Sequence, residues 1–195
     1  VLHADHVVSH ANSVMGLVES FVGVVPAGGG CKEMLYRWTE KLNDTQKGAW
    51  KSFMNIGLGR KANSPQEADA LAMRRADDVF QMNRDRILNI ALSKLDDTKK
   101  ASQRSPLALS GAEHFKEMLE WLEVNNKKGM LTPHDVTVGT EIGRIMSGGD
   151  CPAGTVFSEQ EILDAERSSF ITLAQTQETQ ARIVSMLDNG VTLRN

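Results

Sequence analysis

Cysteine, aromatic residues and an excess of either charge are all scarce in this sequence of 195 residues. The two cysteines, Cys31 and Cys151, are too few to staple a small fold, so the core must come from the 41% of apolar residues. So few cysteines also favour a reducing compartment, and we expect a cytoplasmic protein. The net charge of −3 gives no general attraction for phosphate backbones or anionic lipid. Nucleic acid is therefore not an expected partner.

Long apolar runs are missing as well. The longest stretches, such as residues 21–27, fall far short of the roughly 20 residues that a membrane-spanning helix needs, so no membrane span is expected. The first residues contain neither a basic segment nor a hydrophobic segment with a cleavage site, so we do not interpret them as a signal peptide. The excess of acidic residues lies in residues 131–195, which carry 9 acidic and 4 basic side chains.

The pattern from Cys31 to the C-terminus is typical of helices. Four segments place a Ser or Thr three residues before a carboxylate, the spacing of a helix N-terminal capping box. These pairs are Ser64 with Glu67, Ser110 with Glu113, Thr132 with Asp135, and Ser158 with Glu161. Apolar residues at helical spacing predict three buried stripes. The stripes are Leu88, Ala91, Leu92 and Leu95; Phe115, Met118, Leu119 and Leu122; and Val138, Ile142, Ile145 and Met146.

Residues 1–30 differ, because short apolar segments rich in β-branched residues alternate there with Ser, Asn and Gly. We predict short strands around Val7-Val8, Val14-Met15, Leu17-Val18, Phe21-Val22 and Val24-Val25, with β-structure confined to residues 1–30. A loop from Pro26 to Gly30 then leads into a helix that begins at Cys31. The expected fold class is mainly α with a small β portion at the N-terminus. A polar segment, 96–110, predicts a boundary between residues 1–100 and 101–195.

Two patterns suggest ligand sites but fit them poorly. His3, His6 and His10 would align on a helix for zinc, yet their β-branched neighbours favour a strand, on which His3 and His6 point to opposite faces. We therefore predict no metal site. The segment 57–62 loosely matches a dinucleotide-binding fingerprint, but a helical and polar stretch precedes it, so we interpret it as the end of a helix.

Glu19 is an acid within an otherwise apolar run. It lies either at a solvated strand end, which the context alone favours, or in a cleft that raises its pKa into a range suited to proton transfer. The glycine loop that follows exposes backbone N–H groups at the start of a helix, and these can hold a water or a thioester oxygen.

Residues 15–35, from Met-Gly-Leu-Val-Glu through Pro-Ala-Gly-Gly-Gly-Cys to Lys-Glu-Met-Leu, closely resemble part of the active-site region of the enoyl-CoA hydratase/isomerase (crotonase) superfamily. Residues 64–73 look like a later alanine-centred turn of that family. Residues 131–195 resemble the tail of multifunctional 3-hydroxyacyl-CoA dehydrogenases of fatty-acid β-oxidation. The resemblance implies a truncated α/β crotonase-like fold in residues 1–100, without its N-terminal half, followed by a helical region in residues 101–195.

The resemblance also implies roles for individual residues. Glu19 matches the second of the family's two catalytic glutamates, which exchanges a proton with Cα or with the added water. The N–H of Ala27 matches the group that holds this water, and Gly28 and Gly29 match the rest of the substrate-binding loop. The first glutamate and both oxyanion-hole donors would lie before Val1, so we expect the chain to be inactive alone. Cys31 stands where a Thr is common in the family.

By this resemblance the chain is part of a β-oxidation enzyme that acts on acyl-CoA thioesters. No cofactor is expected in the chain itself, because NAD would bind an upstream dehydrogenase region, which would also be its neighbour in the whole protein. A homo-oligomer is left open. Two alternatives stand beside this hypothesis: another crotonase-superfamily isomerase or hydrolase of CoA thioesters, and a non-catalytic helical docking or oligomerisation module whose acidic C-terminal third binds another domain.

Overall fold

A computed structural model describes residues 1–96 and 103–195. Helices account for 56% of the described residues and strands for 7%, which confirms the mainly helical fold class. The crotonase-like part of that expectation stays a prediction. The chain divides into two compact units, each built from separate stretches of sequence: residues 1–16 with 61–103, and residues 17–60 with 104–195. The second unit thus joins Glu19 and the glycine loop to the C-terminal helices. The predicted boundary at residue 100 lies outside the described residues and stays a prediction.

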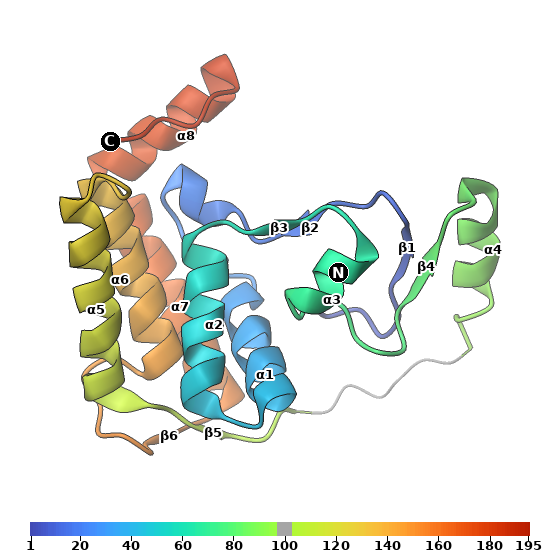
Figure 1. The fold of residues 1–195 in the computed structure, drawn as a ribbon, viewed down its shortest axis with the longest axis horizontal. Coiled ribbons are helices and arrows are strands. Elements are labelled where there is room, and N and C mark those ends of the chain that lie inside the picture. The colour runs from blue at the N-terminus through green and yellow to red at the C-terminus, as the bar shows by residue number, and fades with distance from the viewer. Residues whose placement is uncertain (97–102) are drawn as a thin grey trace. The chain divides into compact units, whose positions relative to one another are not determined.

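The larger unit, 17–60 with 104–195, is a bundle of helices (Figure 1). Its helices are α1 (Gly30–Leu42), α2 (Thr45–Gly57), α5 (Gly111–Lys127), α6 (Pro133–Ser147), α7 (Glu159–Ala174) and α8 (Gln177–Asn189). Helix α1 packs on α2, α2 packs on α6, and α6 packs on both α5 and α7. Their apolar faces form the core, whose fully buried members include Met34, Phe53, Met118, Ile142, Met146 and Leu173.

The capping predictions are confirmed at two helices. Thr132 and Ser158 each accept a hydrogen bond from the backbone three residues on, and the carboxylates of Asp135 and Glu161 bond back to them. At α3 (Pro65–Ala70) only half of the box forms, since Ser64 caps the helix while the Glu67 carboxylate accepts from Asn63.

The prediction at Ser110 is wrong. The Ser110 hydroxyl bonds the ring of His114 at 2.7 Å instead of capping α5. The next residue, Gly111, has φ of +76°, a left-handed conformation that turns the chain away from the geometry of a capping box.

The predicted apolar stripes have different outcomes. All four members of the α6 stripe are buried, and so are Phe115, Met118 and Leu122 of α5, while Leu119 is half-buried. The stripe that begins at Leu88 is not part of the core, which corrects the prediction. Its members Leu88, Leu92 and Leu95 are 66%, 52% and 64% exposed. The helix there, α4 (Ile87–Leu92), has only 6 residues and packs against β1 and a short turn, so its other sides stay uncovered.

The strands are short and pair in twos. In the smaller unit β1 (Val8–His10) runs parallel to β4 (Val79–Gln81), with Val8 opposite Val79, and β2 (Met15–Gly16) runs antiparallel to β3 (Lys61–Ala62). A 3-10 helix, η2 (Arg84–Arg86), precedes α4. In the larger unit β5 (Leu107–Ala108) pairs antiparallel with β6 (Val156–Phe157). The prediction that β-structure is confined to residues 1–30 is therefore wrong, because β3, β4, β5 and β6 lie beyond residue 30.

Three predicted strands, at residues 17–18, 21–22 and 24–25, do not form. Residues Glu19–Val22 form a 3-10 helix, η1, and Val24 and Val25 are buried in the connection that follows it. The apolar pattern correctly indicated burial only at Val24 and Val25, since Val18 and Phe21 are 38% and 40% exposed, and the burial of the two valines does not come from strand pairing.

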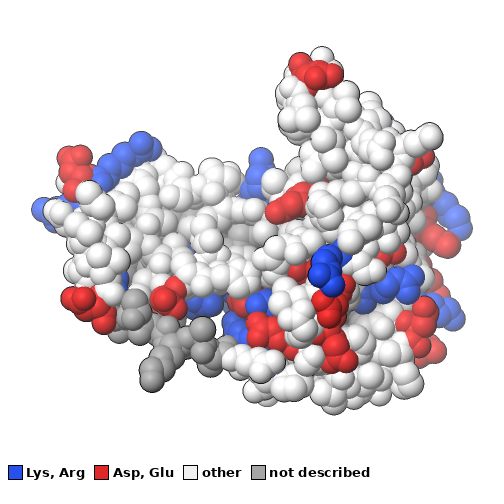
Figure 2. All heavy atoms as spheres, turned by 180° about the vertical axis from the view of Figure 1, so that it is seen from behind, with Lys and Arg blue, Asp and Glu red and all other residues white. Residues whose placement is uncertain are grey.

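Charged side chains of both signs lie interspersed over the face drawn in Figure 2, with no broad basic area on that face. Within residues 1–96 and 103–195, no helix combines the length and the apolar character needed to cross a membrane.

Candidate functional site

Glu19 opens η1 in the larger unit and is half-buried. Its Oε2 atom is buried and has no hydrogen-bond partner among the described residues. A buried carboxylate oxygen that lacks a partner is costly, and such atoms are found where a ligand or an ordered water completes the bonding. Glu19 is thus a carboxylate with an open acceptor, which a fully solvated position would not produce.

The backbone around Glu19 forms a tight turn. The N–H of Gly23 donates to the carbonyl of Ser20 at 3.1 Å, and the N–H of Val24 donates to the carbonyl of Glu19 at 3.2 Å. Gly23 has φ of +86°, which favours glycine and ends the turn. The chain then runs through buried Val24 and Val25 directly into the glycine loop.

The glycine loop, residues 26–30, forms the N-terminus of α1. The N–H groups of Gly30 and Cys31 both donate to the carbonyl of Pro26, at 3.1 and 3.3 Å. A Cβ on Gly30 would lie 2.7 Å from the Cβ of Pro26, so this position requires glycine. Ala27 is half-buried and Gly28 is exposed, and neither N–H is bonded to another described residue. These two groups can therefore donate to a bound water or ligand.

Gly29 has a different environment from its neighbours. Its N–H donates to Oε2 of Glu166 at 2.8 Å, and the N–H of Lys32 donates to Oε1 of the same carboxylate at 2.5 Å. Gly29 also has φ of +85°. Its contribution to the loop is conformational, because its only N–H is already paired; the predicted role in substrate binding stays a prediction.

Glu166 lies on α7 and is fully buried. Burial raises its pKa to about 7, although the hydrogen bonds from the Lys32 and Gly29 backbone favour the charged form and oppose that rise. The Glu166 carboxyl therefore accepts hydrogen bonds from N–H groups at the N-terminus of α1, as a capping side chain does, although it lies on another helix.

The charges of both carboxylates, Glu166 and Glu19, affect the pKa of the Cys31 thiol. This thiol is fully buried, and burial raises its pKa, with the charges of Glu166 and then Glu19 adding to the rise. The thiol is therefore neutral and poorly nucleophilic. Because the charge of Glu19 acts on Cys31, the first turn of α1 lies within electrostatic range of the candidate acid.

A cluster of charges borders the loop, with Lys32 and Glu33 buried and Glu159 and Arg104 half-buried. The Lys32 ammonium lies 3.0 Å from a Glu33 carboxylate oxygen and 2.7 Å from one of Glu159, and Arg104 bonds Glu33 at 3.1 Å. Hydrogen bonding and attraction from these carboxylates outweigh burial and raise the pKa of Lys32. The cluster joins α1 to α7, so it fixes the start of the helix that the glycine loop opens.

Sequence reasoning missed Glu166 and this ion cluster. A signal existed for Glu166, because it stands at helical spacing with buried Ile162, Ser169 and Leu173 on α7. An acid on such a stripe must find partners in the interior. The sequence does not say which N–H groups those would be.

Two other sequence patterns were considered as ligand sites: the histidines near the N-terminus and residues 57–62. His10 lies in β1, accepts from the N–H of Asn12 through Nδ1 at 3.1 Å, and so donates from Nε2 to the carbonyl of Met82 at 2.9 Å. The structure of residues 1–96 and 103–195 contains no group of three or more His, Cys, Asp or Glu suited to a metal ion. Helix α2 ends at Gly57, which confirms the helix-end interpretation of residues 57–62.

A carboxylate with an unpaired oxygen can exchange a proton with a water molecule, and unpaired N–H groups at a helix N-terminus can hold a water molecule. Comparison with known proteins found no matching family model and no matching solved structure. Over 198 aligned residues the chain is 29% identical to a protein of Bacillus subtilis (strain 168) named "Probable 3-hydroxyacyl-CoA dehydrogenase". The alignment takes in the whole chain but only 25% of that relative, so the chain spans about a quarter of its length.

Proposed function

We propose that this chain is a portion of a fatty-acid β-oxidation enzyme that acts on acyl-CoA thioesters, and that Glu19 exchanges a proton there. One observation carries the proposal: Glu19, with an unpaired buried oxygen, stands just ahead of a glycine loop with two unpaired N–H groups. The similarity to a 3-hydroxyacyl-CoA dehydrogenase supports the choice of substrate class.

In the proposed reaction water adds across the C2–C3 double bond of an enoyl-CoA. The water oxygen bonds to C3 and loses one proton, while C2 gains one proton, so the product is the 3-hydroxyacyl-CoA. Glu19 serves one of these two transfers, and the N–H of Ala27 donates to the water and orients it. Gly28 leaves open space beside the loop, because nothing lies within 4 Å of the Cβ position there.

Hydride transfer to NAD belongs, in this proposal, to another part of the polypeptide. A dinucleotide site needs a glycine turn that leads from a strand into a helix, so that the pyrophosphate meets the helix N-terminus. Gly57 is instead the last residue of α2 and Gly59 lies just beyond the end of that helix, so these residues do not fit that group.

The test compares Glu19→Gln with wild type in the full-length polypeptide that contains this chain. Crotonyl-CoA hydration is followed by the loss of the enoyl-thioester absorbance, and NAD-dependent oxidation of a 3-hydroxyacyl-CoA is followed by NADH. Because the amide keeps the shape but cannot exchange a proton, hydration should fall by about 10²–10⁴-fold while oxidation stays unchanged. Glu123→Gln, at an exposed position of α5, is the matched control and should leave both rates unchanged.

Equal loss of both activities in Glu19→Gln would assign Glu19 to folding or docking and favour the helical docking module. Wild-type hydration in the variant would remove Glu19 from the reaction. A preference for isomerisation over hydration, with the same dependence on Glu19, would favour another CoA-thioester activity of the superfamily.

A further inference from the structure

The turn that carries Glu19 is held by a helix far away in the sequence. Nη1 of Arg182 donates to the carbonyl of Ser20 at 3.3 Å, and the hydroxyl of Thr179 donates to the carbonyl of Gly23 at 2.7 Å. Both side chains come from α8. Helix α8 thus bonds the turn at two points, Ser20 within η1 and Gly23 directly after it.

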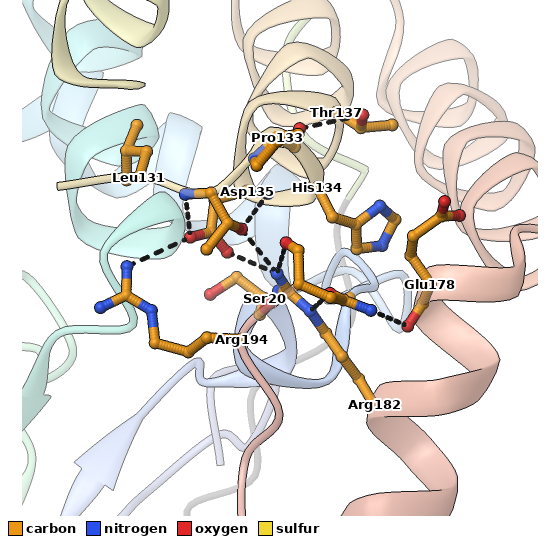
Figure 3. A network of polar contacts seen from close by, with 12 residues as sticks. Ser20, Leu131, Pro133, His134, Asp135, Thr137, Glu178, Arg182 and Arg194 are labelled. Atoms are coloured by element: carbon orange, nitrogen blue, oxygen red, sulfur yellow. Dashed lines mark hydrogen bonds and ion pairs between the residues drawn. The ribbon is translucent and has the colours of Figure 1, made fainter. Parts of the chain in front are cut away.

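Arg182 is a fixed rather than a flexible contact. It is only 2% exposed, and its guanidinium bonds Asp135 at 2.8 Å and the hydroxyl of Thr132 at 3.1 Å (Figure 3). Burial raises the pKa of Asp135, but the bonds from Thr132 and Arg182 outweigh it and lower the pKa, so the counter-ion is ionised at neutral pH. A planar guanidinium bonded on several sides cannot rotate without breaking these bonds.

Thr179 is also fully buried and bonds in two directions. Its hydroxyl proton goes to the carbonyl of Gly23, which only accepts, so Nε2 of His134 donates to Thr179 Oγ1 across 2.8 Å. Burial, and next the charge of Arg182, lower the pKa of His134, so a neutral ring with its proton on Nε2 supplies this bond. A Cβ at Gly23 would lie 2.6 Å from Thr179 Oγ1, which shows how closely α8 approaches the turn.

A third bond holds the turn from another helix. The hydroxyl of Ser20 donates to the carbonyl of Ile56 in α2 at 2.9 Å. The Glu19 carboxylate is different, because its Oε2 has no partner among the described residues. Its position is therefore set by the backbone that carries it, and the backbone by the bonds from α2 and α8.

We propose that Thr179 and Arg182, supported by His134 and Asp135, are positioning residues for Glu19. We call these four residues the α8 clamp, because the two that bond the turn directly, Thr179 and Arg182, lie on α8. The proposal rests on the proposed function of Glu19 as the proton-exchanging group. It gives the C-terminal helices a role in the reaction although none of the four is expected to touch substrate. A displacement of about 1 Å in a catalytic group can cost a factor of about 10² in rate.

The first test removes the two hydrogen bonds of the Thr179 hydroxyl, to Gly23 and from His134, without removing a charge. Thr179→Val keeps the volume but loses the hydroxyl, Thr179→Ser keeps the hydroxyl, and Thr137→Val at an exposed site on α6 is the matched control. In the full-length polypeptide, Thr179→Val should lower kcat for crotonyl-CoA hydration by about 10 to 100-fold at unchanged KM. Thr179→Ser should restore most of it, and Thr137→Val should behave as wild type.

The same variants are then combined with Glu19→Gln. If the clamp acts through Glu19, Thr179→Val costs nothing further in that background. A full additional loss in the double variant would overturn the proposal, and so would wild-type kcat in Thr179→Val while Glu19→Gln abolishes hydration. In both cases the proposed function of Glu19 would stand.

A readout without activity keeps the clamp testable if no hydration is found. Amide hydrogen exchange of a peptide that covers residues 18–24 reports the opening of the turn, since the N–H groups of Gly23 and Val24 are its internal donors. Exchange should become about tenfold faster in Thr179→Val and stay unchanged in Thr137→Val. Unchanged exchange in Thr179→Val would overturn the proposal, whatever the fate of the proposed function.

Discussion

Glu166 makes a prediction about stability that can be worked through from its surroundings. The carboxyl is fully buried on α7, and its pKa is raised from an ordinary value of 4.5 to about 7. Between these two values the folded chain binds a proton that the unfolded chain has released, so stability falls as the pH rises. One pKa unit corresponds to about 1.4 kcal/mol, so Glu166 should remove about 3 kcal/mol of unfolding free energy between pH 4 and 8.

The perturbation is Glu166→Gln, because the amide resembles the protonated acid and does not titrate. Urea unfolding followed by circular dichroism, at half-unit steps from pH 4 to 8, gives the unfolding free energy of both proteins. Wild type should lose about 3 kcal/mol relative to the variant over this range. Burial lowers the pKa of His114 and of His134, so both histidines act in the opposite direction, with stability rising as the pH rises; they cancel in the difference.

A control and a clear refutation complete this test. Glu123→Gln changes an exposed glutamate of α5, so its difference from wild type should stay constant with pH. A constant difference for Glu166→Gln as well would refute the reasoning, because it would mean that Glu166 titrates alike in the folded and unfolded chains. A difference that grows in wild type's favour as the pH rises would refute it too, since the hydrogen bonds from Gly29 and Lys32 would then outweigh burial.

Three further changes have expected outcomes. Gly23→Ala should destabilise the chain by about 1–3 kcal/mol in urea unfolding, because the new Cβ meets Thr179 at 2.6 Å and the backbone φ is +86°; a neutral change would contradict that close approach. Ser158→Ala should cost about 1 kcal/mol through the loss of the α7 capping box, and no loss would mean that water replaces the cap. Peptide mapping after native alkylation should find Cys151 modified and Cys31 unmodified, since Cys31 is fully buried with a raised pKa; early labelling of Cys31 would show that α1 opens.

Features that depend on a few neighbouring residues were predictable. The capping boxes at Thr132 and Ser158 and the loop that leads into α1 follow from local chemistry, and the structure confirms them. Ser110 shows the limit of such rules, because a histidine four residues later competes for the same hydroxyl. Spacing also predicts a helix better than it predicts burial: the apolar stripe at Leu88 lies on a helix, yet it is exposed.

The candidate site was predictable only at its centre. Glu19 and the loop from Ala27 to Gly29 are visible as a motif because they are close together in the sequence. Glu166, Thr179 and Arg182 bond groups of that region across more than 130 residues of sequence, and nothing in their local sequence identifies the N–H or carbonyl groups they bond. Pairing at such separation is decided by the packing of helices, which a single sequence does not specify.

The bonds from α8 to the turn of Glu19 also have a consequence for biosynthesis. Ser20 and Arg182 are 162 positions apart, so the ribosome makes the turn long before it makes the helix that holds it. At about 5–20 residues per second, this interval is roughly 8 to 30 s. During that time the carbonyls of Ser20 and Gly23 lack their side-chain donors, so the nascent chain carries an incomplete site until α8 emerges and docks. A message that stops before α8 would therefore yield a polypeptide with the Glu19 motif intact and its geometry unformed.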